Sequence, residues 1–220
     1  MENGTVKRFI WVSIYAIAMA FMEAVVVAYI RALLDISDTH VSLGPYVRME
    51  VWREAATLVM LAAVGWIAGR RWDDRWAYGL FAFGLWDIFY YVWLRVLLGW
   101  PASLLDWDIL FLIPLRWWGP VLAPVSIAAL ICMAAILAVA RIERGHRLGI
   151  TPWRIGLVAA GSLLALYVFM SDALYAWLTR QPNWIDVRPT PFKWPLFLAA
   201  WALMAIPTLA ATWPQRTKRA

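Results

Sequence analysis

The residues of this chain that could do chemistry are ionisable side chains placed inside long apolar stretches of sequence. Asp87 lies near the middle of the apolar run 76–98. Tyr90 and Tyr91 follow one helical turn later, and Arg95 lies a further turn on. Burying a charged side chain at the centre of a bilayer costs about 3 kcal/mol on insertion scales, so a carboxylate at this place should face protein or water. We therefore expect Asp87 to belong to a functional site.

Further acidic residues are expected at a similar depth. With a rise of about 1.5 Å per residue across a hydrocarbon core of about 30 Å, Glu23, Asp87 and Asp172 fall in the middle or outer part of the bilayer. Arg53 and Glu54 begin another apolar run from that same side. The shared depth predicts a polar cavity that opens to the extracytoplasmic face. The candidates for substrate binding or proton handling are Glu23, Arg53, Glu54, Asp87, Tyr90, Tyr91, Arg95, Asp108 and Asp172.

An alternative interpretation gives these charges a structural role only. The carboxylates within the helices would then form ion pairs with Arg31, Arg53 or Arg95 and hold the helices together, although buried ion pairs seldom add net stability. Asp106 and Asp108 would be ordinary loop residues at the membrane interface. Both interpretations stay open at the level of the sequence.

The elements that must position these side chains are six apolar runs. The composition, 64% hydrophobic and 15% charged residues over 220 positions, is typical of a polytopic membrane protein. We predict an all-α integral membrane protein with a single domain, residues 1–220. Its six transmembrane helices are expected at about 9–30, 53–69, 76–98, 120–140, 153–178 and 192–213.

A segment broken by proline separates the third and fourth expected helices. Residues 100–118 are about as apolar as a helix, but they contain Pro101 and Pro114 and carry Asp106, Asp108 and Arg116. Irregular backbone at membrane depth must be shielded by protein or line a cavity. We therefore expect a re-entrant or interfacial segment, which would cover the cavity together with the 31–51 loop.

The basic residues indicate the orientation of the chain. Lys and Arg gather at the ends of the apolar runs instead of forming one patch, which argues against a nucleic-acid partner despite a net charge of +6. With the N-terminus inside, 12 of the 20 Lys and Arg residues lie on the cytoplasmic side. This bias favours a protein of the plasma membrane with both termini in the cytoplasm.

The absence of several sequence motifs argues against some kinds of functional site. The two histidines, His40 and His146, lie in different loops, so neither bis-histidine haem nor a His-rich metal site is expected. The sequence contains no CxxC, no nucleotide-binding glycine motif and no GxSxG. We predict no metal site, although carboxylates alone could bind calcium or magnesium, and the sequence identifies no cofactor.

Small residues predict close contact along the first helix. Ala16, Ala20 and Ala24 recur at four-residue spacing, which lets another helix approach, either within the chain or from a partner membrane subunit. In size and number of helices, the chain resembles the substrate-binding subunits of energy-coupling-factor vitamin transporters, and the alanine spacing would suit docking of such a subunit. The resemblance concerns architecture alone and transfers no residue roles.

Three functions are compatible with this pattern, so the sequence leaves open whether the protein is an enzyme. The first is solute binding or transport, because carboxylates beside Trp and Tyr suit an organic cation or a ring. The second is a membrane-embedded enzyme acting on a lipid or isoprenoid, in which two carboxyl groups in different environments serve as general acid and general base. The third is a non-catalytic membrane subunit of a larger complex. The expected partners are the lipid bilayer and a small-molecule or lipid ligand.

Overall fold

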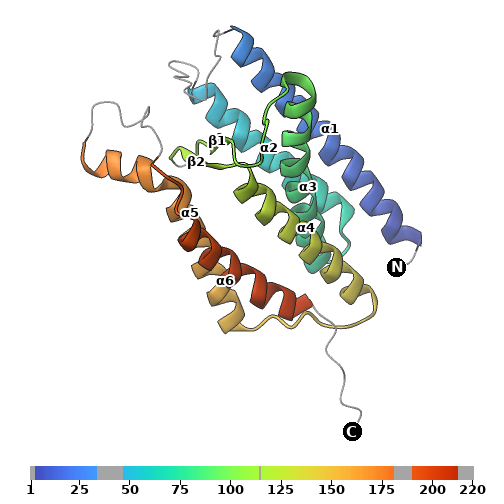
Figure 1. Ribbon diagram of the computed structural model, residues 1–220. Helices are drawn as coiled ribbons and strands as arrows, with labels where there is room; N and C mark the ends of the chain where they lie inside the picture. Colours follow the sequence, from blue (N-terminus) through green and yellow to red (C-terminus); the bar gives the residue numbers. More distant parts are fainter. Residues whose placement is uncertain (1–2, 34–46, 114, 181–189, 213–220) are drawn as a thin grey trace.

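Six helices make up most of the chain (Figure 1). The computed structural model describes residues 3–33, 47–113, 115–180 and 190–212. Its helices are α1 (Asn3–Leu33), α2 (Val47–Ala68), α3 (Trp72–Leu98), α4 (Leu122–Glu143), α5 (Pro152–Leu178) and α6 (Trp194–Thr212). Each is long and apolar enough to cross a membrane, as the sequence predicts.

Two helices begin earlier than their apolar runs. α1 starts at Asn3 and α2 at Val47, whereas the sequence predicted starts near residues 9 and 53. The predicted limits followed hydrophobicity, but the helical backbone continues through polar residues before the apolar run of α1 and through a mixed segment before that of α2. The early start of α2 adds six residues, which include Arg48 and Glu50. The 31–51 loop shrinks accordingly, and its central residues, 34–46, lie outside the described part of the chain.

The fold is otherwise all-helical, as predicted, and the proline-broken segment contains a small antiparallel hairpin. β1 (Trp107–Phe111) pairs with β2 (Trp117–Pro120), with Asp108 opposite Gly119 and an irregular register between Ile109 and Phe111. Proline interrupts helical hydrogen bonding, and a run of aromatic and β-branched residues is suited to an extended strand. The hairpin carries Asp108 back toward the helices, a position that a helix or an open loop would not have given it.

α3 is the central helix of the fold. It packs against α1, α2 and α4, while α5 and α6 pair with each other and contact the remainder through α4 and β2. Ala16, Ala20 and Ala24 are fully buried and pack in the same clusters as α3 residues such as Tyr78 and Leu94. The small-residue face of α1 is therefore occupied by α3 within this chain.

One pair of glycines allows α2 and α3 to cross closely. A Cβ atom added to Gly65 would lie 2.4 Å from the Cα atom of Gly79, closer than any real side chain permits. On the α4 side, a Cβ on Gly84 would lie 2.7 Å from the carbonyl oxygen of Ala128. These contacts bring the neighbouring helices tightly against α3 and thereby fix the positions of the charged residues near its second half.

Candidate functional site

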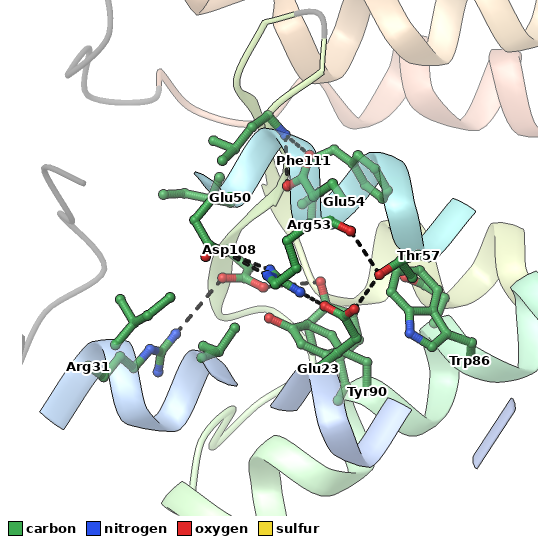
Figure 2. A pocket seen from close by; sticks show the side chains of 17 residues that line it. Glu23, Arg31, Glu50, Arg53, Glu54, Thr57, Trp86, Tyr90, Asp108 and Phe111 are labelled. Atoms are coloured by element: carbon green, nitrogen blue, oxygen red, sulfur yellow. Dashed lines mark hydrogen bonds and ion pairs between the residues drawn. The ribbon is translucent and has the colours of Figure 1, made fainter. Parts of the chain in front are cut away.

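A cavity lies between α1, α2, α3 and β1 (Figure 2). Its volume is about 110 Å³, somewhat below the roughly 150 Å³ of an engineered protein cavity that binds benzene. The lining comes from the second half of α1, the first half of α2, the middle of α3 and the strand β1. The polar and aromatic lining residues are Glu23, Arg31, Glu50, Arg53, Glu54, Thr57, Trp86, Asp87, Tyr90, Tyr91, Asp108 and Phe111.

One side of the cavity is an ion-pair network that joins α1 to α2. The guanidinium group of Arg53 pairs with Glu23 and also contacts Glu50, with 2.7 Å between Arg53 Nη2 and Glu50 Oε2. The hydroxyl group of Thr57 donates a hydrogen bond to Glu23. Glu23 is only 6% exposed, so its charge is neutralised inside the protein. The structural interpretation of the buried charges therefore describes this carboxylate well.

Asp108 enters the cavity from the hairpin. Its Oδ2 atom accepts a hydrogen bond of 3.2 Å from the hydroxyl group of Tyr91, and its Oδ1 atom lies 4.0 Å from Arg31 Nη2. Burial raises the pKa of the Asp108 carboxyl group to about 6, although Arg31, the backbone N–H of Ile109 and Tyr91 favour the ionised form. The guanidinium group of Arg31 also lies over the ring of Trp100, 4.3 Å from its centroid.

Glu54 connects α2 to the hairpin. Its two carboxylate oxygens both accept the backbone N–H of Leu112, at 3.2 and 3.1 Å. Leu112 directly follows β1, so this contact holds the end of the strand against α2. Glu54 thereby positions the strand that presents Asp108 to the cavity.

Asp87 differs from the other carboxylates of the cavity. Within the described residues, its side chain forms no hydrogen bond and no ion pair, and it lies close enough to Asp108 for the two charges to interact. Aromatic rings surround this part of the cavity: the centroids of Trp86 and Tyr90 are 6.3 Å apart, and those of Tyr90 and Tyr91 are 5.1 Å apart. Asp87 is thus a carboxylate that lies beside aromatic rings and forms no ion pair with any described residue.

The described residues that line the cavity carry a net negative charge. They contribute five carboxylates and two guanidinium groups, and Arg53 is already shared between Glu23 and Glu50. Excess negative charge in a partly buried space attracts a cation or a proton. Of the other three carboxylates, Glu54 accepts the backbone N–H of Leu112, and Asp87 and Asp108 lie on the α3 and β1 side.

Two sequence-predicted candidates lie elsewhere. Arg95 donates hydrogen bonds to the carbonyl oxygens of Gly99 and, at 3.1 Å, Pro101, so it closes the end of α3. Asp172, on α5, accepts hydrogen bonds from the backbone and side chain of Thr190 at 2.9 and 2.8 Å. Neither residue lines the cavity.

Sequence reasoning did not include Glu50, Thr57 and Trp86 among the candidates. Glu50 and Thr57 lie three and four residues from Arg53 on the same helix, which is the spacing of neighbouring side chains on one face. For Glu50 this signal was lost because α2 was expected to begin only at residue 53, whereas Thr57 lay inside the expected helix and was not singled out. Trp86 directly precedes Asp87, and nothing separated it from the many other tryptophans of the chain.

No group of three or more His, Cys, Asp or Glu side chains in the described parts of the chain is arranged to hold a metal ion. The chain matches no known protein-family model, and neither a curated protein nor a solved structure shows significant similarity to it.

Proposed function

We propose that this protein is an integral membrane protein that binds a small organic cation in the cavity between α1, α2 and α3, as the binding step of solute transport. The observation that carries the proposal is the carboxylate of Asp87, which has no ion pair from the described residues, in a cavity to which those residues contribute five carboxylates and two guanidinium groups. A positively charged ligand supplies the missing counter-charge at this place.

The aromatic side chains beside Asp87 support the same ligand class. A cation within about 6 Å of an aromatic face gains about 0.5–2 kcal/mol, depending on how far it is desolvated. Tyr90, Tyr91 and Trp86 offer such faces next to the carboxylate. The volume of about 110 Å³ suits a methylated ammonium group or another group no larger than benzene. A larger solute would place only its charged end here.

The direction of access follows from the proposed topology. With both termini in the cytoplasm, as the distribution of Lys and Arg favours, α1 runs outward and its second half lies in the outer leaflet. The cavity is lined by that half of α1, so it opens to the extracytoplasmic side of the plasma membrane. The ligand is accordingly taken from outside the cell.

Binding of methylammonium and of tetramethylammonium to the protein in lipid nanodiscs, measured by isothermal titration calorimetry, tests the proposal. Asp87→Asn should weaken binding of the better ligand at least tenfold, because a charged contact contributes about 1.5–3 kcal/mol. The matched control is Asp73→Asn, which removes the same charge from the exposed first turn of the same helix and should change nothing. Absence of binding by both ammonium ions, or equal losses in the two variants, would refute the proposal.

A second candidate function rests on the different surroundings of two carboxyl groups. Asp108 has Tyr91 and Arg31 as partners, whereas Asp87, in the same cavity, has neither a hydrogen bond nor an ion pair from the described residues. Two such groups can act as acid and base on a lipid or isoprenoid. Incubating the protein with extracted membrane lipids and isoprenoids, followed by mass spectrometry, should reveal a product that Asp87→Asn abolishes if this function applies.

A further inference from the structure

Asp87 and Asp108 are two neighbouring carboxylates of the cavity that share one cation, Arg31, among the described residues. Asp108 is faced by Arg31 from α1 and by Asp87, Tyr90 and Tyr91 from α3. The single cation among these groups is at the 4.0 Å limit of an ion pair and also lies over Trp100. Two carboxylates that share one cavity repel each other, and one positive charge between them removes that repulsion.

Arg53, the second cation that lines the cavity, is paired with other carboxylates. Arg53 is occupied by Glu23 and Glu50, through contacts that join α1 to α2. Releasing Arg53 would leave Glu23, which is 6% exposed, as an unpaired buried charge, and this is costly. Among the described residues, Arg31 is then the one cation left for Asp87 and Asp108. A proton or a cationic ligand would supply the second positive charge.

We propose that the Asp87–Asp108 pair exchanges a bound proton for the positive charge of the ligand, so that uptake of the cation releases a proton from the cavity. This inference rests on the proposed function, since it requires a cationic ligand. In the exchange, the O–H bond of the protonated carboxyl group breaks, the proton passes to water, and the ligand cation pairs with the two carboxylates. No electron transfer and no additional reactant are needed.

The ionisation of Asp108 sets the pH range of the exchange. Burial raises the pKa of the Asp108 carboxyl group to about 6, so this group carries a proton more often at pH 5.5 than at pH 7. A cation that holds Asp108 in its ionised form displaces that proton. Proton release should therefore be larger in mildly acidic medium than at neutral pH.

Proton release can be measured with the dye pyranine in a weakly buffered suspension of the protein in nanodiscs. Tetramethylammonium is the decisive probe because it carries a permanent charge and no proton of its own, and methylammonium is the smaller alternative. Saturating ligand should release more protons per bound cation at pH 5.5 than at pH 7. Asp73→Asn, the exposed control, should release the same amounts.

Two variants test whether Asp108 is the group that releases the proton. Asp108→Asn should abolish most of the release at pH 5.5. Tyr91→Phe removes the hydrogen bond that favours the ionised form of Asp108, so it should increase the release at pH 7, a change in the opposite direction that a misfolded protein would not produce.

The outcomes separate the two proposals. Binding without proton release at pH 5.5, or release that Tyr91→Phe leaves unchanged at pH 7, overturns the exchange and leaves cation binding intact. Failure of both ammonium ions to bind overturns cation binding and the exchange together.

Discussion

The contact between Glu23 and Arg53 should be the main polar tie between α1 and α2, and this can be tested by a double-mutant cycle. Removing one member of a buried ion pair typically costs 3–5 kcal/mol. The cost of Glu23→Gln should be smaller, about 2 kcal/mol, because Arg53 keeps its contact to Glu50 at 2.7 Å and its side chain is 25% exposed. Arg53→Gln should cost about 3 kcal/mol, since it leaves two carboxylates without a partner.

The double variant shows whether the charges of Glu23 and Arg53 stabilise each other. Glu23→Gln combined with Arg53→Gln should cost about 3 kcal/mol, not the sum of about 5, because neutral Gln at position 23 no longer needs a counter-charge. The free energy of unfolding can be followed by circular dichroism during titration of the purified protein with SDS in mixed micelles. Thr57→Val, which removes the hydroxyl donor to Glu23 but keeps the ion pair, serves as the control and should cost only about 1 kcal/mol. Losses that add within about 0.5 kcal/mol would show that the two charges do not stabilise each other.

Three further predictions concern packing, the hairpin and pH. Gly65→Ala should destabilise the protein by more than 2 kcal/mol through a backbone clash, whereas Gly79→Ala, whose new Cβ would meet nothing closer than 3.8 Å, should be neutral or stabilising in the same SDS titration. Glu54→Gln should weaken the anchoring of β1 and speed amide hydrogen exchange at Leu112 at least tenfold; unchanged exchange there would contradict its positioning role. Affinity for tetramethylammonium should rise about tenfold from pH 5 to pH 7, because Asp108, with its raised pKa of about 6, becomes ionised over this range; a flat profile would contradict this.

Hydrophobicity was sufficient to predict the six helices. Apolar runs long enough to span a bilayer leave a chain few alternatives, because backbone polar groups must be satisfied within each segment. The depth argument placed Glu23, Asp87 and Glu54 near one another, and all three line the cavity. The rise per residue along a straight helix gives the depth of each residue in the membrane, but not the side of the helix from which its side chain projects.

That missing direction explains the residues that lie elsewhere. Arg95 lies above Asp87 on the same helix, but it turns to the carbonyl groups after Leu98, a local interaction that helical depth does not predict. Asp172 has a suitable height on α5, but α5 contacts the rest of the fold mainly through α6 and β2, and only the tertiary packing reveals this. The hairpin was hidden for a similar reason: strand pairing depends on two short segments meeting, which hydrophobicity alone does not encode.

The attachment of α5 and α6 has a mechanical consequence. These two helices contribute no residue to the lining of the cavity, yet α5 contacts β2, where the rings of Trp117 and Phe169 stack with centroids 6.1 Å apart. β2 is hydrogen-bonded to β1, which carries Asp108. A continuous set of contacts therefore connects α5 with the strand that carries Asp108, so the packing of the α5–α6 pair helps to fix the position of a charged group that neither helix touches.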